Sequence, residues 1–141
     1  MDNFFSFLSC EAGDVIPESQ IGPISNLQLV KWAAGSGDFN PIHFDLNVAK
    51  KQGLENVLVH GPYKYAFAAK VLMQMLGQNG HIIKLSSSYK GMDISGNTLA
   101  FTGTITDVQQ TEEGRVVKLN YTLNNQKGIA TVNGSAVVMA K

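Results

Sequence analysis

Apolar and polar residues alternate with a period of two through the carboxyl-terminal half of the chain, a pattern that predicts β-strands. The alternation falls into four runs, separated by breaks rich in Gly, Ser and Asn that are typical of hairpin turns. The apolar positions of the runs are, in chain order, Ile83, Leu85 and Tyr89; Leu99, Phe101 and Ile105; Val117, Leu119, Tyr121 and Leu123; and Ala130, Val132, Ala136 and Val138. We therefore expect four antiparallel strands.

The segment before these strands has the pattern of a buried helix, because nearly every side chain from Tyr63 to Leu76 is apolar. Pro62 suits the first turn of a helix, and Gly77 follows its last apolar residue. The polar residues of the segment are Lys64, Lys70 and Gln74, which occupy about one third of the helical circumference. We expect them to form a solvated stripe. For Lys64 the alternative is a contact with a phosphate or an acyl carboxylate.

Two shorter helices are predicted nearer the amino terminus. Ser25 and Gln28 have the spacing of a capping box, and the segment from Gly35 to Gly37 is expected to stop the helix that follows them. The predicted apolar face of this helix consists of Leu27, Val30 and Trp32 to Ala34. Trp32 is expected in the core. Asp45 can cap a second, short helix that ends near Lys51.

The order of these elements predicts the fold class. One long apolar helix that precedes a run of antiparallel strands is typical of an α+β domain in which a curved sheet wraps the helix. The chain has 141 residues, with no internal repeat or linker, so we expect a single domain over residues 1–141. Such a sheet has edge strands, and pairing across a dimer is a common way to cover them.

Composition narrows the functional class. The formal net charge is zero, so the chain has no electrostatic reason to bind nucleic acid or an anionic membrane. The single cysteine, Cys10, excludes an internal disulfide, and the three histidines lack metal-ligand spacing. The first residues, Met1 to Phe5, are acidic where an export signal is basic, and their apolar stretch is short. We therefore expect a cytoplasmic protein, with Cys10 as a buried or incidental thiol.

The segment from Gly37 to His43 carries the candidate chemistry. Pro41 keeps Asn40 out of helical geometry, so the chain bends between Asp38 and His43. The bend can direct a carboxylate and an imidazole into the same small volume, which is the arrangement that proton-transferring enzymes use. Taken alone, Asp38 has the alternative role of a turn cap. The pair together indicates an enzyme.

The run Ala34 to His43, which reads AGSGDFNPIH, and the later Val59-His60-Gly61 resemble the signature of the MaoC-like (R)-specific enoyl-CoA hydratase family. This resemblance implies a hotdog fold over essentially the whole chain. It implies hydration of a trans-2-enoyl thioester to the (R)-3-hydroxyacyl thioester, or the reverse dehydration, with no metal or organic cofactor. The substrate handle would be coenzyme A or, in some members, an acyl-carrier protein.

The family's residues match this chain at a few positions. Asp38 and His43 correspond to the catalytic pair, and Gly61 to the glycine whose backbone N–H meets the thioester oxygen. Asn40 corresponds to the asparagine that braces the turn. The candidate substrate-binding residues are Asn40, Pro62 and Tyr63, although Tyr63 fits core packing equally well. His60, beside Gly61, is interpreted as a structural histidine.

One departure from the family pattern motivates a second hypothesis, and a third comes from another class of protein. Many single-subunit members have a serine eight residues beyond the glycine, where this chain has Ala69. The chain is therefore expected to act either as a homodimer or higher homo-oligomer, or as the catalytic subunit of a heteromeric dehydratase. The hypothesis from another class is a non-catalytic acyl-CoA-binding module, which would not need both Asp38 and His43.

Overall fold

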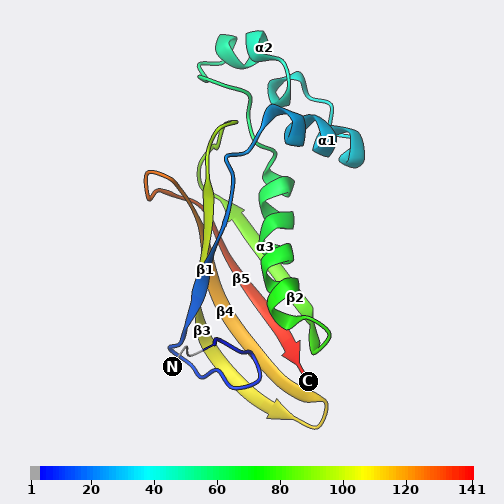
Figure 1. Ribbon diagram of the computed structural model, residues 1–141, viewed down its shortest axis with the longest axis vertical. Coiled ribbons are helices and arrows are strands. Elements are labelled where there is room, and N and C mark those ends of the chain that lie inside the picture. Colours follow the sequence, from blue (N-terminus) through cyan, green and yellow to red (C-terminus); the bar gives the residue numbers. More distant parts are fainter. Residues whose placement is uncertain (1–3) are drawn as a thin grey trace.

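A computed structural model describes residues 4–141 of the chain. Its elements are β1 (Val15–Ile21), α1 (Asn26–Ser36), the 3₁₀ turn η1 (Pro41–His43), α2 (Leu46–Lys51), α3 (Gly61–Leu76), β2 (Gly80–Tyr89), β3 (Leu99–Thr111), β4 (Gly114–Asn125) and β5 (Ala130–Ala140). The strands form one antiparallel sheet in the order β1-β3-β4-β5-β2. Helix α3 lies along one face of this twisted sheet, and α1 and α2 gather beyond its end (Figure 1).

The core lies between α3 and the sheet, and the period-two pattern of the central strands predicts it correctly. The buried apolar side chains of β3 and β4 are Leu99, Phe101, Ile105, Val117, Leu119, Tyr121 and Leu123, each at most 2% exposed. Helix α3 packs against them with Phe67, Ala68, Val71, Leu72 and Leu76. The expected α+β domain, in which a sheet covers one apolar helix, is therefore confirmed.

The predicted helix caps are present. Ser25 Oγ accepts the N–H of Gln28 at 3.2 Å, and Gln28 Oε1 accepts the N–H of Ser25 at 2.7 Å, which completes the capping box. Asp45 Oδ1 accepts the N–H of Asn47 at 2.9 Å at the start of α2. Gly35 lies inside α1, and the helix ends at Gly37, whose φ of 77° is the left-handed conformation that glycine adopts without strain.

The structure corrects the predicted face of α1. Leu27 and Val30 are 62% and 48% exposed, while Leu29 and Ala33 are buried. Helix α1 lies beyond the end of the sheet, so only a narrow strip of it meets the rest of the fold (Figure 1). Because apolar residues lie on both sides of α1, the sequence pattern could not show which of them would be buried. Trp32 is half-buried at its margin and is not a core residue.

The sheet contains a strand that the alternation did not predict. β1 has only one buried side chain, Ile16, because it is an edge strand that pairs with β3 alone. The polar run Glu18 to Gln20 and a bulge between Ile16 and Ser19 interrupt the period-two signal. An edge strand with few buried residues gives little periodicity from which to recognise it.

Three apolar positions of the predicted strands, Ile83, Tyr89 and Ala130, are exposed. A bulge between Ile82 and Lys84 reverses the alternation of β2, so Ile83 is 50% exposed and Ile82 packs on the core. A register shift between Leu123 and Asn124 precedes the hairpin to β5, where Ala130 is exposed and Thr131 is buried. In both cases an extra residue moves the following side chains to the other face.

Within residues 4–141 no helix is both long enough and apolar enough to cross a membrane. The expectation drawn from the first residues depends partly on residues 1–3, which lie outside the described part. Cys10 is buried, as expected. Burial raises the pKa of its thiol, and the nearby Arg115 guanidinium offsets only part of this increase. The predicted pairing of the sheet edges across a dimer stays a prediction.

The contact between β5 and Tyr121 gives a test of the core. A Cβ added at Gly134 would lie 2.2 Å from the Tyr121 ring and 2.4 Å from the Ser86 carbonyl oxygen. We expect Gly134→Ala to lower the free energy of unfolding by about 1–3 kcal/mol, the usual cost of overpacking. The measurement is urea-induced unfolding.

Gly35→Ala is the matched control, because a Cβ there meets nothing within 4 Å and the residue lies inside α1. It should raise stability by about 0.5–1 kcal/mol through helix propensity. Equal effects from the two substitutions would contradict the packing described between Tyr121 and Gly134.

Candidate active site

The bend after α1 has the geometry that its sequence predicts. Asn40 is non-helical, with φ −59° and ψ 122°, and its side-chain oxygen accepts the N–H of Ile42 at 3.2 Å at the start of η1. Asp38 Oδ1 in turn accepts the N–H of Asn40 at 3.3 Å. Asn40 therefore braces the turn, and the remaining carboxylate oxygen of Asp38, Oδ2, is free to face His43.

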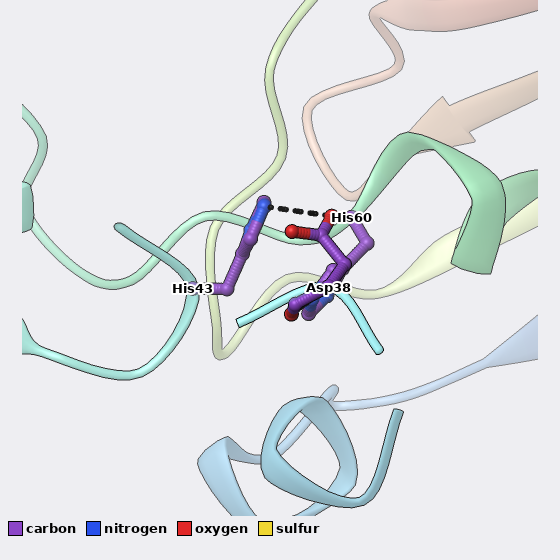
Figure 2. A group of neighbouring side chains, drawn as sticks. All are labelled: Asp38, His43 and His60. Atoms are coloured by element: carbon purple, nitrogen blue, oxygen red, sulfur yellow. Dashed lines mark hydrogen bonds and ion pairs between the residues drawn. The ribbon is translucent and has the colours of Figure 1, made fainter. Parts of the chain in front are cut away.

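His43 is held in one orientation and one tautomer. Its Nδ1 lies 2.7 Å from the carbonyl oxygen of Leu58. Since a carbonyl oxygen only accepts, Nδ1 carries a hydrogen, and in the neutral ring the lone pair is on Nε2. Nε2 lies 3.6 Å from Oδ2 of Asp38 (Figure 2). The structure thus brings together the two residues that the sequence predicted to converge.

The separation between the two groups suits a shared water molecule. At 3.6 Å they are too far apart for a direct hydrogen bond, and both present lone pairs to the same space. The Asp38 side chain is 45% exposed and that of His43 only 9%, so the space opens on the carboxylate side. A water bound there would have two acceptors for its two hydrogens.

His60 completes the cluster in a way that the sequence did not reveal. It is fully buried, and its ring stacks on that of His43 with centroids 3.7 Å apart and planes inclined by 19°. Its Nε2–H donates a long hydrogen bond, 3.4 Å, to the backbone oxygen of Asp38. Desolvation lowers the pKa of His60, and the neighbouring His43 lowers it further, while the Asp38 carbonyl and carboxylate act in the opposite direction.

Gly61 begins α3, directly after His60. The first amides of a helix have no acceptor within the helix, so the Gly61 N–H is available to a ligand and lies at the positive end of the dipole. A Cβ at this position would lie 3.1 Å from the Tyr89 ring. Glycine at this position therefore lets the Tyr89 ring pack closely against the start of α3.

An open, mostly apolar groove of about 490 Å³ lies between α1 and the start of α3. Its walls include Trp32 and Tyr63, whose rings meet edge to face with centroids 5.5 Å apart. Burial raises the pKa of Tyr63. Ser36, also in the wall, accepts the N–H of Asp38, so the groove borders the Asp38 loop. Pro62 is exposed at the start of α3.

Ligand atoms of Asp38, His43 and His60 lie within 4.8 Å of one another, but the arrangement does not fit a metal ion. A metal bound to an imidazole lies in the plane of the ring, about 2 Å from the nitrogen. The two rings are stacked and nearly parallel, so no point lies in both planes at that distance. The stack instead supports the plane of the His43 ring.

Lys64 is not in the solvated stripe that the helical pattern predicted. It is 2% exposed, and its Nζ lies 3.0 Å from the Asp93 carboxylate. Lys70 and Gln74 are exposed, as expected. A favourable partner far along the chain can bury a lysine, and the helical pattern carries no information about such a partner.

Comparison with known proteins places these residues in context. A family model described as "MaoC like domain" matches residues 11–127. The chain is 30% identical over 116 residues to an (R)-specific enoyl-CoA hydratase from Aeromonas caviae. That match covers 79% of this chain and 82% of that protein. It is 43% identical over 51 residues to a mitochondrial 3-hydroxyacyl-[acyl-carrier-protein] dehydratase from Arabidopsis thaliana, and that match covers 36% of this chain and 30% of that protein.

A solved structure also matches nearly the whole fold. It is described as the (R)-hydratase from A. caviae involved in PHA biosynthesis. The TM-score is 0.84 at 25% identity, and the match covers 94% of this chain and 98% of that one. The expected hotdog fold is therefore confirmed.

The burial of His60 predicts how stability depends on pH. Because its pKa is lowered on folding, the unfolded chain, with a histidine pKa of about 6.5, takes up the proton first on acidification. The unfolded state then binds more protons, so the free energy of unfolding should fall as pH drops from about 7 to 5.5. We expect His60→Gln to flatten this dependence, as measured by denaturant unfolding at each pH.

His81→Gln is the matched control, because His81 is exposed on β2. A pH dependence that disappears in this variant, and persists in His60→Gln, would show that burial of His60 is not its origin.

Proposed function

The chain belongs to the MaoC-like family of hydratases and dehydratases, and we propose that it hydrates trans-2-enoyl thioesters to (R)-3-hydroxyacyl thioesters, or catalyses the reverse dehydration. One observation carries the proposal: the Asp38 carboxylate faces Nε2 of His43 at 3.6 Å, and Nδ1 of the same ring is committed to Leu58. The similarity to the A. caviae hydratase supports the substrate class and the stereochemistry.

In the hydration direction, Asp38 and His43 hold and deprotonate one water. The water oxygen bonds to the β-carbon as the C=C double bond breaks, and the electron pair moves toward the thioester oxygen. A proton from the same pair is then delivered to the α-carbon, so that one molecule of water is added in total. Because one carboxylate–imidazole pair makes both proton transfers, from the water and to the α-carbon, addition is on one face.

The developing negative charge needs a donor, and the proposed one is the backbone N–H of Gly61. A preorganised amide of this kind is worth about 3 kcal/mol in comparable oxyanion sites. The dipole of α3, whose positive end is at Gly61, acts in the same direction. Glycine allows a bulky thioester to approach the backbone closely.

The remaining site residues are assigned to substrate binding or to support of the turn. Tyr63, together with Trp32, forms an apolar wall beside the Asp38 loop, which suits the aliphatic part of a thioester. Pro62 is exposed next to the Gly61 amide and would contact the substrate there. Asn40 acts by holding the turn, since its side-chain oxygen is bonded to Ile42. The thioester handle is coenzyme A or an acyl-carrier protein, and the proposed assembly is a homodimer or higher homo-oligomer.

Removal of either member of the pair should abolish efficient turnover. We expect Asp38→Asn and His43→Ala to lower kcat for crotonyl-CoA and longer enoyl-CoAs by about 10²–10⁴-fold, because each variant loses proton transfer at the shared water. The assay is loss of the enoyl thioester absorbance, with chiral analysis of the 3-hydroxyacyl product.

The matched controls are Asp107→Asn, in β3, and His81→Ala, on the exposed side of β2, both of which should keep wild-type kcat. An (S) product would contradict the proposed stereochemistry. Wild-type activity in both site variants would remove the roles assigned to the pair, and tight acyl-CoA binding without hydration would favour the binding-module hypothesis.

The heteromeric alternative depends on Ala69, which is half-buried in α3 and has no hydroxyl. If the chain alone is a homo-oligomer with hydratase activity, no second subunit is needed. We expect that result from size-exclusion chromatography followed by assay of the eluted peak. Ala69→Ser should then leave the assembly unchanged, and an inactive wild type that gains activity only with a second hotdog chain would support the heteromer.

A further inference from the structure

The buried pair Lys64–Asp93 has no role in the proposed chemistry and needs an explanation. Lys64 is 2% exposed and Asp93 is fully buried, and their charged atoms lie 3.0 Å apart. Removing two charges from water costs several kcal/mol, and their attraction offsets this only when the geometry and the other hydrogen bonds are good. Apolar residues at both positions would fill the same space without that cost.

The hydrogen bonds around the pair are nearly complete. Lys64 Nζ also donates to the carbonyl oxygen of Gly91 at 3.1 Å. Asp93 Oδ2 accepts the hydroxyl of Thr131 at 2.5 Å, and its Oδ1 accepts the amide of Asn97 at 3.1 Å. The pair therefore ties together α3, the loop between β2 and β3, and the start of β5.

The position of Lys64 in α3 makes stability a poor explanation for the pair. Lys64 follows shortly after the amino-terminal end of α3, where the helix dipole disfavours a cation. Asp93 compensates this charge locally. A lysine that is both buried and at the unfavourable end of a helix indicates that the exact placement of this turn matters.

The loop between β2 and β3, which contains Asp93, contacts both the segment that anchors His43 and the start of α3 with Gly61. The backbone oxygen of Asp93 accepts the N–H of Val59 at 2.8 Å, and Leu58 forms a β-bridge with Ile94. Leu58 is the residue whose carbonyl oxygen binds Nδ1 of His43. Through its side chain Asp93 thus holds the first turns of α3, which begin with Gly61, and through its backbone it holds the segment that anchors His43.

We propose that Lys64 and Asp93 are a positioning pair that sets the Gly61 amide relative to the His43 imidazole. The pair does not touch the substrate and acts through these two groups. This inference rests on the proposed function, because its effect on catalysis requires that the two groups serve one reaction. It goes further by assigning a functional reason to a buried ion pair, one member of which, Lys64, the helical pattern placed at the surface.

The test separates positioning from stability with a double-mutant cycle. Lys64→Met and Asp93→Asn alone each leave a buried charge unpaired, so both should lower the melting temperature. The double variant has no buried charge and keeps amide contacts to Thr131 and Asn97, so its melting temperature should recover. Its kcat should nevertheless stay lower by about tenfold with KM unchanged, as expected for reacting groups displaced by a fraction of an ångström.

Lys70→Met, at an exposed site of the same helix, is the matched control and should change neither quantity. A double variant that recovers both melting temperature and kcat would show that the pair is only structural, and would overturn the proposal. If the double variant does not fold, Thr131→Val tests the same point, because it removes one bond to Asp93 and keeps both charges. It should lower kcat several-fold, and wild-type kcat in this variant would overturn the proposal.

A measurement without substrate distinguishes failure of this inference from failure of the proposed function. The NMR signals of the Gly61 amide and the His43 Nδ1–H should both shift in the double variant and stay in place in Lys70→Met. Signals that do not move would overturn the positioning role even if the wild type proves to have another activity. Shifted signals in a protein without hydratase activity would remove the proposed function and leave the positioning role of the pair.

Discussion

The hydrogen bond from His43 to the carbonyl oxygen of Leu58 is the contact on which the arrangement of the site depends. It joins a short bend outside the sheet to a segment that the β-bridge with Ile94 attaches to the body of the fold. At 2.7 Å it sets the direction of the imidazole and leaves only Nε2 free to act on a ligand. Without it, the stack on His60 would still fix the plane of the His43 ring, but not which nitrogen faces Asp38.

The large apolar interface between α3 and the sheet fixes the other part of the candidate site, the start of α3. Because α3 is packed along the sheet, its first turn has a defined position, and so does the Gly61 amide. Reacting groups on a packed helix are held more precisely than groups on a free loop. Helices α1 and α2 contribute less buried surface, and the bend between them is held mainly by hydrogen bonds of its own side chains.

Burial increases steadily across the cluster, from an Asp38 side chain that is 45% exposed to a His60 that is fully buried. This gradient leaves the carboxylate accessible to solvent while the inner imidazole stays neutral, since desolvation lowers its pKa. A neutral ring stacked on His43 supports that ring without adding a like charge. The candidate site therefore combines a side that is open to solvent with a buried side that supports the His43 ring.

Much of the local structure was determined by the sequence alone, because its causes lie within a few residues of one another. The capping bonds of Ser25 and Asp45, the bend at Asn40-Pro41 and the alternation of β3 and β4 all belong to this class. Tertiary structure decided the features whose partners are distant. Lys64 meets Asp93 from 29 positions away, and His60 stacks on His43 across the bend. Neither contact can be recognised from the periodicity of the sequence, since a buried charge or a stacked ring is stabilised by residues that only the fold places beside it.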